Sequence, residues 1–184
     1  MSIHNDIQKI MFSEEQIAKI ISELGQKITE DYKDKNLLVV GILKGSVVFM
    51  ADLLRKINIP CKIDFMALSS YGDSTRSSGV VRVIKDLSTN IEGYDVLIIE
   101  DILDSGNTLS HLREMLRLRH PKSLKICTFF DKPERRVVMD LVPDYVGAEI
   151  PDEFIVGYGL DYAERYRNLP YVGVLKPELY SSGK

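Results

Sequence analysis

The stretch VLIIEDILDSGNTL, residues 96–109, decides the fold class of this chain. Its first part is a continuous apolar run, which is typical of a strand buried on both faces of a parallel sheet. The acids Glu100, Asp101 and Asp104 follow, and a small polar turn then leads into a helical pattern. Because ligands bind at the carboxyl ends of parallel strands, the stretch predicts a buried strand that carries acidic side chains into a binding site.

The polar turn Ser105-Gly106-Asn107-Thr108 has the composition of a phosphate cradle. Backbone N–H groups and the positive end of the helix dipole attract an anion at the start of a helix. The hydroxyls of Ser105 and Thr108 can donate further hydrogen bonds, and Gly106 lets the backbone approach a ligand closely. The turn lacks the Gly-Lys-Ser/Thr of a Walker A loop, so this cradle is of another type.

Acids beside a phosphate cradle need a partner other than the phosphate. Glu100 and Asp101 can accept hydrogen bonds from two sugar hydroxyls, or they can hold a hard divalent cation. A ribose 5-phosphate unit satisfies both halves of the stretch and places Asp104 near the anomeric carbon, where a general base is useful. The alternative is structural: Asp104 or Ser105 caps the helix, and the other two acids are solvated at the strand end.

The remaining patterns predict an α/β fold. Ser13 and Gln16 form a capping box before a helical pattern, and residues 37–43 resemble another buried strand. Further helix and strand patterns alternate along the chain, at 47–56, 61–68, 105–119 and 124–130. This alternation predicts a mainly parallel sheet flanked by helices. We expect a single domain, 1–184, with a small C-terminal hood built mainly from about 145–184; a contribution from the N-terminal segment is left open.

Composition excludes several classes of protein. A net charge of −3 argues against a dedicated nucleic-acid binder, which needs a basic surface. No apolar run approaches the roughly 20 residues that span a bilayer, and the N-terminus lacks the apolar core of a signal peptide. Cys61 and Cys127 lie in apolar segments, which predicts free thiols. We therefore expect a cytoplasmic protein that has neither nucleic acid nor a membrane as its partner.

The segment SSYGDSTRSSG, residues 69–79, is small and polar and lies between two strand patterns. Its composition fits a long hairpin loop and a mobile lid over a site equally well.

Residues 96–109 resemble the phosphoribosyl-pyrophosphate motif of the type I phosphoribosyltransferases: an apolar run, two acids, two apolar residues and Asp-Ser/Thr-Gly-x-Thr. The resemblance extends over most of the chain, to the hypoxanthine(-guanine) phosphoribosyltransferases in particular. It implies a purine salvage enzyme that transfers the 5-phosphoribosyl group from phosphoribosyl pyrophosphate to N9 of a 6-oxopurine. Hypoxanthine, or also guanine, would give IMP or GMP and pyrophosphate. It implies Asp104 as the catalytic base, and Glu100, Asp101 and 104–108 as the donor-binding residues.

Two further stretches match segments around the leaving group. GILKGSVVFMADLL is similar to the pyrophosphate loop of the family, at Leu43-Lys44-Gly45, where the family has a non-proline cis peptide. LSSYGDSTRSSG resembles the flexible catalytic loop, with Ser70 and Tyr71 as its marker pair, and this likeness favours the lid. A closed lid would exclude water from the activated sugar.

The match TFFDKPERR implies that Lys132 donates to the 6-oxo group of the purine and selects against adenine. In PDEFIVGYGLDYAERYRNLP, Phe154 would stack on the base and the Ile155 backbone would read its pyrimidine edge. Glu153 stands where some relatives have lysine. Taken alone, Lys132 belongs to a solvated charged turn and Phe154 is a core aromatic.

The same segment implies that Asp161 binds Mg²⁺, together with Glu100 and Asp101, and that Arg167 clamps pyrophosphate oxygens. The resemblance also implies homodimers or homotetramers. A rival function is that of regulators that resemble these transferases and sense nucleotide supply while binding RNA or DNA. The basic stretch from Arg113 to Lys125 could serve that role. A pyrimidine or adenine transferase is a second rival, which the match around Lys132 disfavours.

Overall fold

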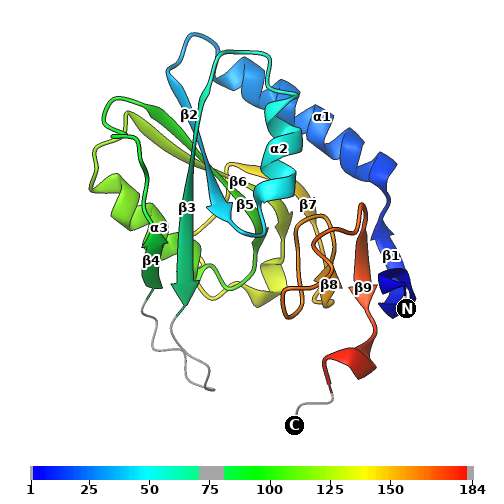
Figure 1. Ribbon diagram of the computed structural model, residues 1–184. Helices are drawn as coiled ribbons and strands as arrows, with labels where there is room; N and C mark the ends of the chain where they lie inside the picture. Colours follow the sequence, from blue (N-terminus) through cyan, green and yellow to red (C-terminus); the bar gives the residue numbers. More distant parts are fainter. Residues whose placement is uncertain (1, 71–80, 182–184) are drawn as a thin grey trace.

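The computed structural model describes residues 2–70 and 81–181 (Figure 1). Most of the expected lid, including Tyr71, lies outside the described residues. Ser70 is the last residue of strand β3.

The main sheet has six strands in the order β4-β3-β2-β5-β6-β7. All neighbouring pairs are parallel except β3 and β4. The strands are β2 (Leu37–Leu43), β3 (Lys62–Ser70), β4 (Val81–Lys85), β5 (Asp95–Leu103), β6 (Ser123–Asp131) and β7 (Tyr145–Glu149). The stretch that opened the sequence analysis forms β5, between β2 and β6. The expected α/β class with a mainly parallel sheet is confirmed.

Helices cover both faces of this sheet. They are α1 (Glu14–Asp31), α2 (Val47–Leu54) and α3 (Asn107–Arg117), with short 3₁₀ turns at Ile3–Asp6, Pro133–Arg135 and Pro177–Leu179. Alternate residues of β5 face opposite layers: Leu97 packs in the core with α1 and α2, and Ile98 packs in the core with α3. This two-sided burial explains why the strand sequence is continuously apolar.

The predicted capping box begins α1. The Ser13 hydroxyl accepts a hydrogen bond from the Gln16 N–H at 3.3 Å, and the Gln16 side chain accepts one from the Ser13 N–H at 2.8 Å. Both bonds satisfy donors that have no partner inside the helix, and such a cap stabilises it by about 1 kcal/mol.

A second, antiparallel sheet of three strands has the order β1-β9-β8. Its strands are β1 (Ile7–Phe12), β8 (Ile155–Val156) and β9 (Val172–Leu175). The N-terminal segment therefore pairs with the C-terminal part of the chain (Figure 1). Strand β7 starts at residue 145 but belongs to the main sheet, so the C-terminal strands of the small sheet begin only at Ile155.

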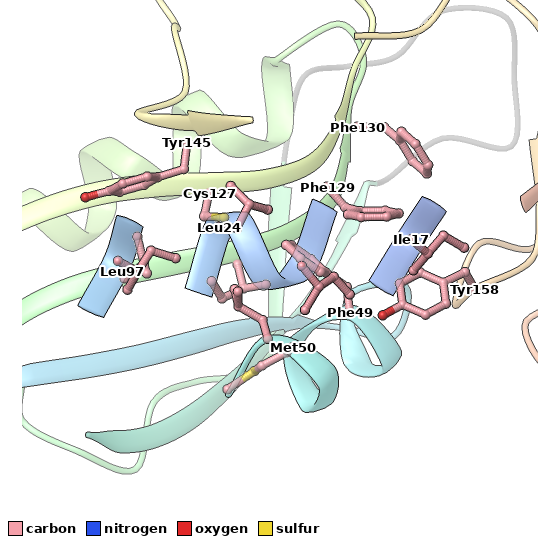
Figure 2. Close-up of a cluster of buried hydrophobic side chains, with 14 of the residues drawn as sticks. Ile17, Leu24, Phe49, Met50, Leu97, Cys127, Phe129, Phe130, Tyr145 and Tyr158 are labelled. Atoms are coloured by element: carbon pink, nitrogen blue, oxygen red, sulfur yellow. The ribbon is translucent and has the colours of Figure 1, made fainter. Parts of the chain in front are cut away.

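The small sheet shares its core with the main sheet. The Tyr158 ring lies 5.2 Å from the Phe129 ring of β6, and Phe129 in turn lies 4.9 Å from Phe49 of α2. Figure 2 shows these rings in the same cluster as Ile17 of α1. The Tyr158 hydroxyl also donates to Asp52 of α2 at 2.6 Å. We propose from this continuity that the chain is one domain, with the three-stranded sheet as its hood.

Asp64 ties β3 to the segment that follows β4. Its buried carboxylate accepts hydrogen bonds from the N–H groups of Ser88 at 2.8 Å and Thr89 at 2.9 Å, and from that of Phe65 at 2.7 Å. Burial acts to raise the pKa of Asp64, but these hydrogen bonds outweigh it and lower the pKa below its ordinary value. The ionised form is therefore the one that stabilises the fold.

We expect Asp64→Asn to lower the free energy of unfolding by about 1–3 kcal/mol at pH 7. Because the folded pKa lies below the unfolded one, this stabilisation is complete above the unfolded pKa of about 3.9 and is lost as the pH falls through the folded value. Urea unfolding of both proteins at pH 7 and at acidic pH values checks this. A difference that stays constant down to pH 3 would show that the charge of Asp64 is not the cause.

Candidate active site

The cradle residues lie where β5 turns into α3. Gly106 precedes the helix with a φ of +85°, a left-handed conformation that glycine adopts without strain. The helix has no side-chain cap, so the interpretation of Asp104 or Ser105 as an N-cap is wrong. Instead, the Ser105 hydroxyl accepts a long hydrogen bond from the Asn107 N–H at 3.4 Å. This weak bond uses only the first N–H of α3, and the N–H groups of the next residues have no side-chain cap and can donate to an anion.

A cavity of about 180 Å³ opens over this turn. Its polar lining comes from the predicted donor-binding residues Glu100, Asp104, Ser105, Gly106 and Thr108, whereas Asn107 does not line it. Its apolar wall comes from Leu68, Ile102, Leu103, Leu109 and Leu112. A polar floor beside a helix start can hold a phosphate group.

A second cavity, of about 450 Å³, lies between the end of β5 and the hood. It collects residues from distant parts of the chain: Asp101, Ile102, Asp104, Lys132, Arg135, Asp152, Glu153, Phe154, Ile155, Leu160, Asp161 and Tyr180. Ile102 and Asp104 line both cavities. Asp104 therefore stands at the junction between the phosphate-sized cavity and the larger one.

The carboxylate of Asp104 is only partly satisfied. Its Oδ2 lies 3.7 Å from Nη1 of Arg135, and its buried Oδ1 has no hydrogen-bond partner in the described part of the chain. The backbone carbonyl of Asp104 accepts a bond of 3.2 Å from Arg136, whose guanidinium also pairs with Asp131. A buried oxygen without a partner is costly and is expected where a ligand supplies the missing donor.

Glu100 and Asp101 form a close acidic pair and are not the solvated acids of the structural alternative. Burial and the neighbouring charge of Asp101 raise the pKa of Glu100 well above its ordinary value, and burial also raises the pKa of Asp101. A side-chain carbon on Gly45 would lie 1.8 Å from Oδ2 of Asp101, so the loop after β2 contacts this pair at the backbone. Two adjacent, half-buried carboxylates can accept hydrogen bonds from hydroxyl groups or hold a cation.

The oxygen donors suit a magnesium ion that shares its coordination with a ligand. Mg²⁺ takes one or two carboxylates and completes its shell with water and phosphate oxygens. Among the described residues, no three His, Cys, Asp or Glu side chains form a complete protein cage. Asp161 is engaged by Arg167 at 2.8 Å and by the Glu164 N–H at 2.9 Å. Glu100 and Asp101 are the freer ligands of the predicted set.

The loop after β2 and the hood meet backbone to backbone. The Leu43–Lys44 peptide bond is cis. A side-chain carbon on Gly159, whose φ is +99°, would lie 2.1 Å from the carbonyl oxygen of Gly45. Arg167 donates to the Gly159 carbonyl at 2.8 Å. The predicted pyrophosphate residues Lys44, Gly45 and Arg167 therefore come together, although Arg167 lies far from the other two in the sequence.

Gly159→Ala should lower the free energy of unfolding more than Gly93→Ala does. Both glycines have a positive φ, but a carbon added at Gly93 meets no atom within 4 Å. The control should cost about 1–2 kcal/mol from conformation alone, and the clash at Gly159 should raise the cost to about 3–5 kcal/mol. Urea unfolding measures both values. Equal costs would mean that the contact between Gly159 and Gly45 is looser than described.

Lys132 is buried, with only 7% of its surface exposed, so it is not part of a solvated turn. Its ammonium donates to the Glu153 carbonyl at 2.7 Å and lies 3.7 Å from Asp152. An ammonium has three donors, so one remains for a ligand in the larger cavity.

Phe154 is 38% exposed and lines the same cavity, so it is not a core aromatic. Its ring stacks on Tyr180 at 4.6 Å and meets Tyr162 edge-on at 5.5 Å. Ile155 is buried and begins β8. An exposed, oriented aromatic ring beside a buried cation is suited to a flat, polar heterocycle.

Sequence reasoning missed Arg135, Asp152 and Tyr180. Arg135 contacts Asp152 at 2.7 Å and Asp104 at 3.7 Å, and so connects the end of β5 to the hood. Arg135 follows Lys132 closely in the matched stretch, and this proximity was the available signal. Tyr180 lies in a tail whose local pattern points to no site.

Comparison with known proteins fits this geometry. Residues 8–163 match the family model described as the phosphoribosyl transferase domain. The chain is 59% identical to a hypoxanthine-guanine phosphoribosyltransferase of Streptococcus agalactiae, covering 97% of this chain and 99% of that protein. It is 56% identical to the "Bifunctional protein TilS/HprT" of Listeria monocytogenes, of which it spans only 28%.

The fold agrees as well. A crystal structure of a hypoxanthine phosphoribosyltransferase from Staphylococcus aureus superposes with a TM-score of 0.93 at 54% identity, covering 97% of this chain and 96% of that one. Fold, motif and sequence identity over nearly the whole length lead to the same result. This chain belongs to the phosphoribosyl transferase family, among the hypoxanthine-guanine phosphoribosyltransferases.

Proposed function

We propose that this protein transfers the 5-phosphoribosyl group from phosphoribosyl pyrophosphate to N9 of hypoxanthine or guanine, as a purine salvage enzyme. The observation that carries the proposal is the position of Asp104, which lines both the cavity over the cradle and the cavity with Lys132 and Phe154. A sugar phosphate in the first cavity and a purine in the second would meet beside this carboxylate.

The sugar is held at two points. The cradle from Ser105 to Thr108 would bind the 5-phosphate through N–H and hydroxyl donors, and Glu100 with Asp101 would accept bonds from the ribose hydroxyls. Fixing both ends aligns the anomeric carbon with the base. The bond from this carbon to the pyrophosphate oxygen breaks, the bond to N9 forms, and Asp104 takes the proton that the base loses.

The purine is selected by a cation and a ring. Lys132 would donate to the 6-oxo group, Phe154 would stack on the base, and the Ile155 backbone would read its pyrimidine edge. Adenine presents an amino group to the same ammonium, which leaves two donors facing each other. The pocket therefore favours 6-oxopurines.

The leaving pyrophosphate would be bound by Lys44, the Gly45 backbone and Arg167. Mg²⁺ bound at Glu100 and Asp101 would supply further neutralisation of the pyrophosphate charge, and Asp161 is proposed as a ligand on the side of Arg167. Ser70 and Tyr71 are proposed to belong to a lid that excludes water.

The direct test is incubation of the chain with phosphoribosyl pyrophosphate, Mg²⁺ and each purine, with nucleotide formation followed by chromatography. We expect IMP from hypoxanthine and GMP from guanine, and little product from adenine. Xanthine in parallel would define the selectivity further. Absence of any nucleotide would refute the proposal.

The regulatory alternative needs a basic surface for RNA or DNA. The arginines of the stretch from Arg113 to Lys125 already pair with acids: Arg113 with Asp140 at 3.0 Å and Arg119 with Asp86 at 2.8 Å. Guanidinium groups that are neutralised by acids attract phosphates weakly. This surface therefore favours the transferase function over the regulatory one.

For the assembly and its place in the cell, we propose a homodimer or homotetramer in the cytoplasm. Both cysteines are free, which suits a reducing compartment. Within the described residues, no helix combines the length and apolarity that a bilayer crossing requires. Light scattering after size exclusion would determine the assembly.

A further inference from the structure

One carboxylate binds both of the cationic side chains that are assigned to pyrophosphate. Oε2 of Glu164 lies 2.9 Å from the ammonium of Lys44, and its Oε1 lies 3.4 Å from Nη2 of Arg167. The hydrogen bond from Lys44 holds the pKa of Glu164 below its ordinary value, so this carboxylate is charged. Each oxygen of Glu164 thus serves one cation, as two oxygens of a pyrophosphate would.

A tight turn presents Glu164 to these cations. Ala163 and Glu164 have φ values of +51° and +61°, and the ends of the turn are joined by hydrogen bonds between Tyr162 and Arg165. The Glu164 N–H donates to Asp161 at 2.9 Å. Left-handed conformations are unfavourable for residues other than glycine, so the surrounding contacts must maintain this turn.

The Glu164 side chain is free to leave. It is 65% exposed, and so is most of the Lys44 side chain, so water can replace their contact. Arg167 is held independently, by the Gly159 carbonyl at 2.8 Å and by Asp161 at 2.8 Å. Removal of the Glu164 carboxylate would leave at least this guanidinium in place.

We propose that Glu164 is an internal competitor for pyrophosphate: its carboxylate occupies Lys44 and Arg167 in the free protein and is displaced when pyrophosphate oxygens bind. The inference rests on the proposed function. Because the Glu164 carboxylate must be displaced first, phosphoribosyl pyrophosphate and the pyrophosphate product both bind more weakly than they would without it. The competitor returns when pyrophosphate leaves, and so it favours product release.

A purely structural role for Glu164 predicts the opposite result. If its ion pairs mainly position Lys44 and Arg167 for the ligand, then Glu164→Gln should weaken pyrophosphate binding. If Glu164 competes, then the same substitution should strengthen it. The sign of the change therefore separates the two roles.

The test is calorimetric titration of Glu164→Gln and wild type with inorganic pyrophosphate in Mg²⁺, with steady-state kinetics in parallel. Exposed ion pairs are weak because water screens them, so loss of the competing carboxylate should change binding by only a small factor. We expect pyrophosphate to bind about 2- to 5-fold more tightly in the variant. The KM for phosphoribosyl pyrophosphate should fall to a similar extent, while the KM for hypoxanthine should not change.

The matched control is Glu114→Gln on α3. Glu114 also bridges two cations, Arg113 at 3.3 Å and Arg117 at 2.9 Å, and it is 58% exposed, but neither of these cations is assigned to pyrophosphate. The Glu114→Gln substitution also removes one negative charge, and it should leave pyrophosphate binding unchanged. A gain in this control equal to that of Glu164→Gln would overturn the proposal, because net charge would then explain both.

A double substitution tests whether the competition acts through Lys44. In a Lys44→Met background, Glu164→Gln should give less than half of its gain, because the closer of the two contested cations is gone. An undiminished gain would indicate long-range repulsion and would overturn the proposal, as would unchanged or weaker binding in the single variant. If the wild type forms no nucleotide from any purine, the proposed function fails first. If it turns over and Glu164→Gln matches it, only this inference fails.

Discussion

Replacement of Asp104 by asparagine should reduce kcat by about 10²–10⁴-fold, the range that a positioned general base contributes. Asparagine has nearly the shape of aspartate but cannot take a proton from the purine. The bond from Arg136 goes to the backbone carbonyl of residue 104, so it survives the change. The KM for phosphoribosyl pyrophosphate should change little, because the cradle and the neighbouring acids are the proposed donor-binding residues.

The matched control for this prediction is Asp152→Asn. Asp152 binds the same Arg135 and lines the larger cavity, but it does not line the cavity over the cradle. Its substitution should lower kcat by less than about 10-fold, because it removes only partly exposed ion pairs, with Arg135 and with Lys132. Steady-state kinetics with both substrates varied measure both variants. An unchanged kcat in Asp104→Asn would remove Asp104 from the chemistry.

Lys132→Ala should lower kcat/KM for hypoxanthine by about 10- to 150-fold, because a hydrogen bond to a charged group contributes about 1.5–3 kcal/mol. Selection against adenine should weaken as well, since the ammonium no longer faces the 6-amino group. The KM for the donor should stay close to that of the wild type. The substitution also removes the donor to the Glu153 carbonyl, which should lower the free energy of unfolding by about 1–3 kcal/mol.

Lys9→Met is a matched control for Lys132. Lys9 also binds Glu153, at 2.7 Å, but through the side-chain carboxylate, and it does not line the larger cavity. It should leave the ratio of hypoxanthine to adenine turnover as in the wild type. Competition assays with both purines measure this ratio. Full discrimination against adenine in Lys132→Ala would refute the role of Lys132.

Local sequence patterns were enough to predict a mainly parallel sheet and the strand β5 that ends in Glu100 and Asp101. These features are encoded by residues that are close together in the sequence. Examples are the capping box at Ser13, the strands β2 and β5 that are buried on both faces, and the turn before α3. The boundary of the hood was less accessible. Strand β8 has two residues, too few to show any periodicity, and β7 resembles the later segments in composition although it pairs with β6.

The sequence by itself determined that a buried parallel strand ends in acids and in a polar turn that starts a helix, because strand burial and helix starts leave signatures within a few residues. Only the tertiary structure decided that β1 joins the hood, that Arg135 lies between Asp104 and Asp152, and that Glu164 reaches Lys44. Lys44 and Glu164 are separated by 120 positions. Such contacts depend on how the packed layers bring distant backbone segments together. A local pattern of residue types carries no information on which distant segments will meet.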